Sequence, residues 1–235
     1  MKTMHLFAGV GGGLLADRIL GHDPIIAVEW DRYACQVLRE RAADGWFPNL
    51  SVWEGDVRLF NPSEYANRVD CIHAGFPCTD LSVSGNQAGL GEDTRSGLYR
   101  EVIRIAGIVR PKYIFLENVS AILYQGLESV LSDLAAMGFD ARWCCLFASH
   151  VGAKHQRDRW FLLAYPHGTQ LKRGRISSRG EQKDSDPGLG GWWENKPAIL
   201  GVANGLPNQM DALKGYGNAQ VPLQAAVAWK LLGGE

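Results

Sequence analysis

The sequence lacks any long run of apolar residues. No hydrophobic stretch approaches the roughly 20 residues that cross a bilayer, and residues 1–7 lead into a glycine-rich turn without a long apolar segment. These absences argue against a membrane protein and against a secretory signal. We therefore expect a soluble protein located in the cytoplasm, with no membrane partner.

Paired cysteines and an excess of one charge are also absent. The five cysteines form no Cys-x-x-Cys pair, which argues against a disulfide framework and a structural zinc site, so we expect free thiols and no bound metal. The 24 Lys and Arg residues nearly balance the 25 Asp and Glu residues. Binding to nucleic acid would therefore require a local basic patch.

The chain does show alternating strand and helix patterns. Apolar runs predict strands, and helical periodicity predicts helices between them and near the C-terminus. The expected strands are 3–7, 24–29, 50–54, 69–74, 113–116, 141–147 and 160–164, and the expected helices are 14–20, 33–41, 98–109, 127–137 and 222–232. This alternation predicts an α/β fold whose mostly parallel sheet is covered by helices on both faces.

The composition changes after residue 164. From about 167 to 191, Gly, Ser, Arg, Lys and Asp prevail and periodicity is weak, which indicates an irregular surface lobe. We expect three parts: a main domain at 1–164, a very small lobe at 165–215, and a C-terminal helix at 216–235 that returns to the main domain.

A glycine-rich turn, residues 7–13, follows the first expected strand and would let the backbone approach a ligand closely. Leu14 stands where a dinucleotide fingerprint requires a third glycine or alanine. Glu29 and Trp30 end the second strand, where a carboxylate could bind ribose hydroxyls and an indole could stack on a purine. Asp56, after the third strand, could accept from an exocyclic amine. These strand ends favour S-adenosylmethionine over NAD.

A second set of chemical groups follows other strands. Cys78 lies on a Gly/Pro-rich loop directly after an apolar run, and Glu117 ends the apolar strand 113–116. A thiolate and a carboxylic acid suit covalent addition to an electron-poor ring, because the acid can protonate a ring nitrogen while the thiol attacks carbon. Arg157 and Arg159 alternate before a strand and should project to one side of it, where they could orient Glu117 and bind a carbonyl oxygen.

Taken together, these motifs resemble the ordered series of the DNA (cytosine-5) methyltransferases. The resemblance covers nearly the whole chain and is carried by Phe7-Ala8-Gly9-Val10-Gly11-Gly12, Glu29-Trp30-Asp31, Gly55-Asp56-Val57, Gly75-Phe76-Pro77-Cys78, Glu117-Asn118-Val119, Gln156-Arg157-Asp158-Arg159 and Gly217-Asn218-Ala219-Gln220-Val221-Pro222. Among such enzymes this would be a compact phage or prokaryotic type. The resemblance implies a Rossmann-like, S-adenosylmethionine-dependent methyltransferase fold.

The resemblance also implies individual roles. Cys78 would add to C6 of cytosine, Glu117 would engage N3, Arg159 would contact O2, and Arg157 would support the glutamate. The residues implied to hold S-adenosylmethionine are Phe7, Gly9, Gly11, Glu29, Trp30, Asp56, Val57, Pro77, Leu98 and Asn218. His5 and Thr79 depart from the family's usual residues, at positions without bond-making chemistry.

The implied substrate is double-stranded DNA. A cytosine must leave the base stack before its ring can be attacked, and the small polar stretch 81–96 has the composition of a lid that would assist. The residues expected to contact DNA are Ser82, Ser84 and Gln87 in that stretch, and Lys172, Arg173 and Arg175 in the lobe. The lobe is shorter than the family's target-recognition region. We expect a monomer, with or without a cognate restriction enzyme.

Three alternatives remain open at this point. The same chemistry could act on an RNA cytosine. The chain could be a catalytically silent DNA-binding relic, although Cys78, Glu117, Arg157 and Arg159 are all present. A nicotinamide oxidoreductase is disfavoured by Leu14 in the glycine-rich turn.

Overall fold

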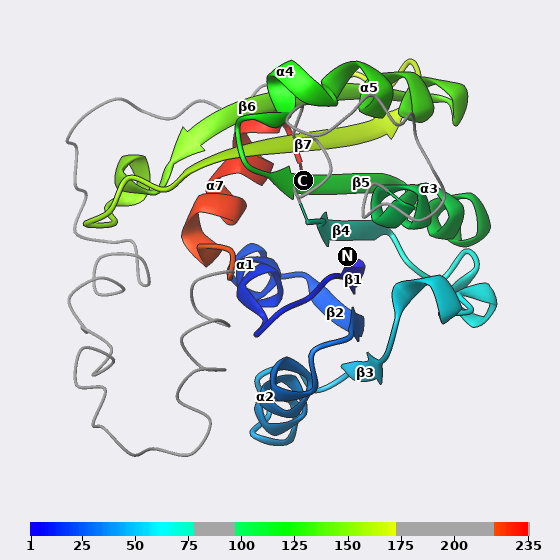
Figure 1. Ribbon diagram of the computed structural model, residues 1–235, viewed down its shortest axis with the longest axis vertical. Helices are drawn as coiled ribbons and strands as arrows, with labels where there is room; N and C mark the ends of the chain where they lie inside the picture. The colour runs from blue at the N-terminus through cyan, green and yellow to red at the C-terminus, as the bar shows by residue number, and fades with distance from the viewer. Residues whose placement is uncertain (78–96, 173–218, 235) are drawn as a thin grey trace, which may run out of the picture.

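The computed structural model describes residues 1–77, 97–172 and 219–234. Its strands form one seven-stranded sheet in the order β3-β2-β1-β4-β5-β7-β6 (Figure 1). The strands are β1 (Lys2–Leu6), β2 (Asp23–Glu29), β3 (Ser51–Glu54), β4 (Cys71–Gly75), β5 (Tyr113–Asn118), β6 (Phe139–Phe147) and β7 (Asp158–Pro166). Strands β1 to β5 are parallel, and β7 runs antiparallel to both β5 and β6. The prediction of a mostly parallel α/β fold is confirmed.

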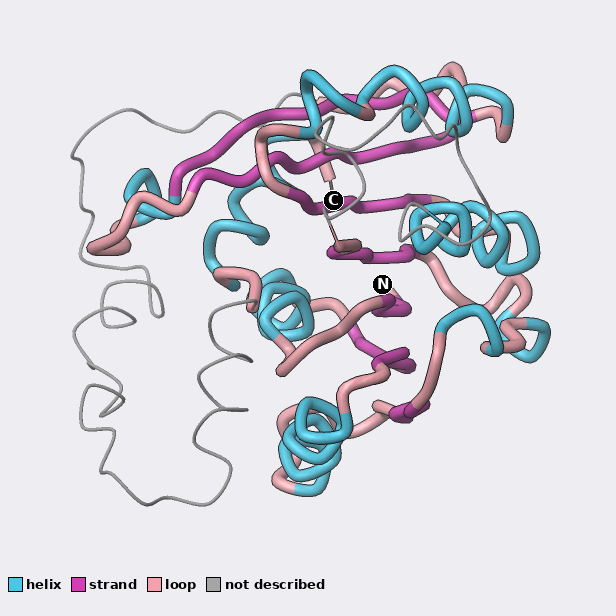
Figure 2. The backbone as a smooth tube through the Cα atoms, in the orientation of Figure 1, coloured by secondary structure: helices cyan, strands magenta, loops and turns pink. Residues whose placement is uncertain are grey.

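Helices connect and cover the strands (Figure 2). They are α1 (Gly12–Leu20), α2 (Arg32–Ala43), α3 (Gly97–Val109), α4 (Ile122–Gln125), α5 (Leu127–Ala136) and α7 (Pro222–Leu232), with 3-10 turns η1 (Val57–Leu59), η2 (Ser63–Tyr65) and η3 (Ala148–Val151). Local chemistry sets several ends. Asp31 caps α2 by accepting from the Ala34 N–H, and Pro222 opens α7, where a missing backbone N–H costs nothing.

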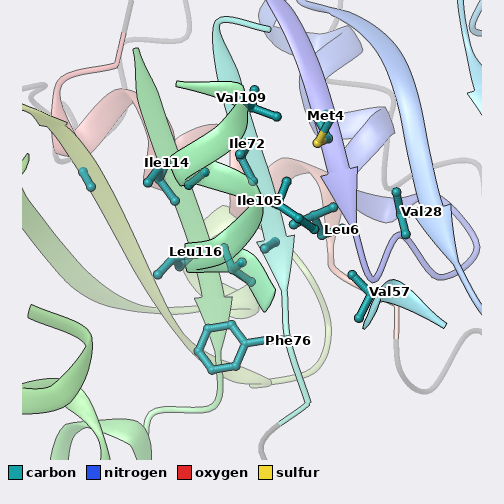
Figure 3. Close-up of a cluster of buried hydrophobic side chains, with 14 of the residues drawn as sticks. Met4, Leu6, Val28, Val57, Ile72, Phe76, Ile105, Val109, Ile114 and Leu116 are labelled. Carbon is teal, nitrogen blue, oxygen red and sulfur yellow. The ribbon is translucent and has the colours of Figure 1, made fainter. Parts of the chain in front are cut away.

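One face of the sheet packs against α3, α4 and α5. Its core includes Met4, Leu6, Ile72, Ile114 and Leu116 from the central strands (Figure 3). Facing them are the apolar sides of α3 and α5, with Val102, Ile105, Ala106, Val109, Val130 and Leu134 buried. This packing fixes the positions of β1, β4 and β5 relative to one another.

The opposite face packs against α1 and α7, which lie side by side (Figure 1). Trp229 of α7 is almost fully buried and contacts Tyr113 and Phe115 of β5 edge to face. Because α7 docks here, the residues just before it, Ala219 and Gln220, lie beside the turn that follows the first strand. In the structure α7 packs on this face of the sheet through Ala225, Ala226, Ala228, Trp229 and Leu232.

The two strands at the far edge are longer than their apolar runs predicted. β7 begins at Asp158 and ends at Pro166, whereas the apolar run predicted 160–164. Its first residues are only half-buried, so an apolar-run criterion misses them although their backbone pairs with β6. As a result Arg159 lies inside β7 and Arg157 directly before it. Most of the expected lobe, residues 173–215, lies outside the described residues.

In the three described ranges, no helix is both long enough and apolar enough to cross a membrane.

The approach of α7 to α1 requires a residue without a side chain at position 12. A Cβ on Gly12 would lie 2.3 Å from the backbone oxygen of Gln220. Such a contact forces the backbone to shift, because neither atom belongs to a flexible side chain.

We expect Gly12→Ala to lower the free energy of unfolding by about 1–3 kcal/mol, the usual cost of overpacking. The matched control is Gly107→Ala inside α3, where a Cβ would meet nothing within 4 Å. This control should stabilise the protein by up to about 1 kcal/mol through helix propensity. Urea unfolding of both variants decides, and equal stabilisation by both would contradict the close packing of α1 and α7.

Candidate active site

The carboxyl ends of β1, β4 and β5 meet the glycine-rich turn at one edge of the sheet. A small cavity of about 40 Å³ lies there, lined by the turn, by the ends of these strands and by Ala219 and Gln220 before α7. Gly75 of β4 pairs with Glu117 of β5. Two residues earlier in β4, His73 pairs with His5 of β1 on one side and with Phe115 of β5 on the other. The edge where parallel sheets bind ligands is therefore formed by residues far apart in the sequence.

Glu117 is the buried acid of this site. Its side chain is held at both oxygens: Arg159 Nε lies 2.9 Å from Oε1, and Gln220 Nε2 donates to Oε2 at 3.4 Å. Burial raises the pKa of Glu117, although Arg159, Gln220, Arg157 and His73 all act in the opposite direction. A carboxyl group with a raised pKa can carry a proton closer to neutral pH.

The two arginines near Glu117 have different contacts. Arg159 makes the ion pair with the carboxylate, whereas Nη2 of Arg157 donates to the Ala219 carbonyl at 2.7 Å. Burial, with a contribution from the charge of Arg159, lowers the pKa of Arg157. Arg157 also has a left-handed backbone, with φ at +34°, which is uncommon for a residue with a side chain. Arg157 thus connects the start of β7 to the segment before α7.

Asn118 connects Glu117 to the segment that leads to Cys78. Its side-chain amide donates to the Phe76 carbonyl at 3.2 Å, and its oxygen accepts from the Val119 N–H at 2.8 Å. Asn118 is buried, so these bonds fix the end of β4 next to Glu117. Pro77 follows and is exposed, and Cys78 itself lies outside the described residues.

Glu29 is buried at the end of β2 and organises the glycine-rich turn. Its Oε2 accepts from the Gly9 N–H at 2.7 Å, and its Oε1 accepts from the N–H groups of Trp30 and Asp31 at 2.9 Å each. Phe7 in the same turn has a φ of +58°, a left-handed value that costs energy in a residue with a Cβ. Glu29 is therefore bonded to backbone on both oxygens, and the carboxylate keeps acceptor capacity for hydroxyl donors.

The other residues expected at the cofactor have different surroundings. Trp30 is 77% exposed, so its indole face is open to stacking. Asp56 caps η1 and bonds to Arg58, and the hydrogen bond from Arg58 lowers the pKa of Asp56. Val57 and Leu98 pack against the core of the α3 face rather than lining the cavity.

The structure describes few of the residues that we expect to contact nucleic acid. Ser82, Ser84, Gln87, Arg173 and Arg175, together with Asn218 of the cofactor set, lie outside the described residues. Lys172 is described and exposed, but its carbonyl oxygen lies beside Gly233, at the C-terminal end of α7. Gln220 precedes the other end of that helix, so the structure does not bring Lys172 to the cavity.

Beneath the cavity lies a buried cluster of His5, Asp17 and His73. His5 Nε2 is 2.8 Å from Asp17 Oδ2, and His73 Nδ1 is 3.8 Å from Asp17 Oδ1. These three donor groups lie within 4.8 Å of one another, close enough to hold a cation, yet the bond to His5 already pairs the carboxylate. Burial disfavours ionisation of Asp17, but His5, through its charge and its hydrogen bond, and the nearby His22 and His73 keep the pKa of Asp17 well below the usual range.

Sequence reasoning missed this cluster and the part played by Gln220. In the sequence His5 stands out only as a departure from the family's usual residue, and Gln220 only as a member of a motif. A histidine at 5 and another at 73 are two strand positions that the parallel register brings together, which no local pattern reveals. For Gln220, its position two residues after Asn218 was the available signal.

The fold and the glycine-rich turn define a class of protein. The sheet order, the antiparallel β7 and the glycine-rich turn after β1 are those of a Rossmann-like methyltransferase fold. The structure of the Dnmt2 methyltransferase of S. pombe has this fold: it aligns with a TM-score of 0.60 at 17% identity, over 79% of this chain and 58% of that chain.

Sequence comparisons then give the family. The family model for C-5 cytosine-specific DNA methylases matches residues 1–213, so the chain belongs to this family and the resemblance is confirmed. The type II methyltransferase M.CviJI of Paramecium bursaria Chlorella virus IL3A is 31% identical over 230 residues, 97% of this chain and 58% of that protein. M.NgoMIV of Neisseria gonorrhoeae is 33% identical over 166 residues, 69% of this chain and 51% of that protein. The chain thus spans about half the length of these curated relatives.

The buried histidine predicts a pH dependence of stability. Burial lowers the pKa of His5, although Asp17 acts against this. The unfolded chain then takes up a proton at position 5 before the folded chain does, so stability falls as the pH drops below the ordinary histidine pKa of about 6.5.

We expect His5→Gln, which keeps a side-chain N–H for Asp17, to make this fall shallower in urea unfolding between pH 5 and 8. His167→Gln provides a control of opposite sign. A hydrogen bond to Asp140 raises the pKa of His167, so its contribution to stability is present at low pH and lost as the pH rises. The control should therefore steepen the fall. An unchanged slope in His5→Gln would show that His5 titrates normally.

Proposed function

We propose that the chain transfers a methyl group from S-adenosylmethionine to C5 of cytosine in double-stranded DNA. The observation that carries the proposal is Glu117: a buried acid, held between Arg159 and Gln220, directly beside the strand end that leads to Cys78. The type II methyltransferases among its relatives, and the family to which it belongs, support the same reaction.

The reaction begins with attack by the Cys78 thiolate on C6 of a cytosine turned out of the duplex. Glu117 donates its proton to N3 as the C6–S bond forms, which leaves C5 nucleophilic. C5 then takes the methyl group from the sulfonium of S-adenosylmethionine, which departs as S-adenosylhomocysteine. Loss of the C5 proton to a base expels the Cys78 thiolate, and return of the N3 proton to the Glu117 carboxylate gives 5-methylcytosine and restores the acid.

The environment of Glu117 suits an acid in this reaction. Its pKa is raised by burial, so the protonated form is available nearer neutral pH, and Arg159 limits the rise by favouring the carboxylate. Arg159 can contact O2 of the ring once the base displaces it from Oε1. Arg157 donates to the Ala219 carbonyl and so connects the start of β7, which carries Arg159, to the segment before α7.

The cofactor would bind across the glycine-rich turn. Glu29, whose acceptors already order the turn, can receive the ribose hydroxyls, and the exposed Trp30 indole can stack on adenine. Asp56 would accept from the adenine amine in exchange for part of its contact with Arg58. Phe7, Gly9 and Gly11 shape the turn, while Val57, Pro77, Leu98 and Asn218 stay predictions from the family.

Recognition of DNA is proposed on the sequence alone. Ser82, Ser84 and Gln87 would approach the vacated stack, and Lys172, Arg173 and Arg175 would neutralise phosphates. A single active chain in the cytoplasm, with or without a cognate restriction enzyme, stays part of the same proposal.

Cys78→Ala tests the nucleophile. We expect methyl transfer to fall below detection, because no C6–S bond can form, while S-adenosylmethionine binding stays within about threefold of wild type. Tritium transfer to duplex DNA and calorimetry with the cofactor measure the two quantities. Turnover near that of wild type would refute the covalent mechanism.

Glu117→Gln tests the acid. An amide cannot protonate N3, so single-turnover transfer should slow by about 10²- to 10⁴-fold, the usual range for loss of a general acid. Glu128→Gln is the control, because Glu128 is exposed on α5 and undergoes the same chemical change away from the site. Equal rates in the two variants would remove Glu117 from the chemistry.

Parallel assays identify the substrate. Duplex DNA and transfer RNA are offered to the same preparation, and methylated positions are read by bisulfite sequencing. The proposal requires methylation of the DNA, whereas methylation of RNA alone would assign the same chemistry to an RNA cytosine.

A further inference from the structure

Gln220 is a residue of the site to which neither the motif that contains it nor the steps of the proposed reaction assign a role. It lies two residues before α7, and its amide Nε2 donates to Oε2 of Glu117 at 3.4 Å across 103 positions of sequence. Arg159 holds the other oxygen from β7. The carboxyl group is therefore gripped from two sides, by a charged group and by a neutral amide.

The surroundings of Gln220 leave its side chain little freedom. A Cβ on Gly75 would lie 2.8 Å from Nε2 of Gln220 and 3.1 Å from Oε2 of Glu117, so the donor and the acceptor both sit directly over this glycine. A Cβ on Gly13 would lie 2.9 Å from Oε1 of Gln220. Both ends of the amide thus rest against positions where a larger residue would displace them.

Backbone contacts fix the residue as well. The backbone oxygen of Gln220 lies against Gly12, and the neighbouring Ala219 carbonyl accepts from Arg157 at 2.7 Å. The rings of His5 and His73 also approach Gly13, because their nearest atoms would lie 3.2 and 3.0 Å from a Cβ on that glycine. The buried histidine cluster therefore forms one wall of the space in which the Gln220 amide lies.

We infer that Gln220 is a positioning residue for Glu117: its clamped amide sets the orientation of the carboxyl group and favours the carboxylate after the proton has been given to cytosine. The amide acts through Glu117 and need not touch the substrate. In naming the reaction, the inference rests on the proposed function. The hydrogen bond between Gln220 and Glu117 does not depend on the proposed function, because it belongs to the folded chain itself.

This role has consequences that a packing role lacks. An N–H donor to the carboxylate lowers the pKa of the acid, so its removal should raise that pKa. Gln220→Met keeps the length and volume of the side chain and removes the donor. Gln220→Ala removes the side chain entirely and serves if the methionine variant fails to fold.

The direct test is a carbon-13 titration of the full chain labelled at the glutamate carboxyl carbons. The Glu117 signal is assigned by its loss in Glu117→Gln. In Gln220→Met, and equally in Gln220→Ala, we expect the Glu117 titration to move to higher pH than in wild type. Gln224→Met is the matched control: Gln224 is a buried glutamine of α7 that donates to the Leu146 and Arg157 carbonyls and not to Glu117. It should lower the melting temperature without moving the Glu117 titration.

Single-turnover methyl transfer to duplex DNA provides the second readout. Gln220→Met should react about tenfold more slowly at its optimum, as expected for a displaced catalytic group, with the alkaline limb of its pH profile moved upward. An unmoved Glu117 titration in both Gln220 variants overturns the inference. Wild type that fails to methylate any nucleic acid overturns the proposed function instead, and the titration still decides the role of Gln220.

Discussion

The structure depends on one close approach, in which the backbone before α7 lies against the first turn of α1. Gly12 makes room for the Gln220 carbonyl, and Trp229 buries its indole against Tyr113 and Phe115 to hold the helix there. This contact brings residues 219 and 220 to the ends of β1, β4 and β5. Without it, Glu117 would lose a hydrogen-bond donor and the Arg157 side chain would lose its anchor.

Burial of Glu117 in this arrangement changes its acid strength. The same enclosure that raises the pKa of Glu117 makes each contact to its carboxylate stronger, since fewer water molecules compete. Arg159 and Gln220 favour the charged form while burial favours the neutral one. A group balanced in this way can both donate a proton and hold the resulting charge, as an acid that completes a catalytic cycle must do.

The sequence predicted the fold and the chemical groups better than their contacts. Apolar runs identified the central strands because they are buried on both faces, but missed the half-buried start of β7, which contains Arg159. Glu117 could be predicted because an acid at the end of an apolar strand is unusual. The contact of Glu117 with Gln220, and the pairing of His5 with Asp17, depend on register and helix docking, so no local pattern shows them.

The proposed reaction requires Cys78 to bond covalently to a cytosine whose N3 is protonated by Glu117. Duplex DNA containing 5-fluorocytosine tests this most directly. Fluorine replaces the C5 proton whose loss would expel the thiolate, so the covalent adduct persists after methyl transfer. We expect the wild-type chain to form a complex that depends on S-adenosylmethionine, survives denaturing electrophoresis and is absent with Cys78→Ala. Methylation of ordinary DNA without any such complex would contradict it.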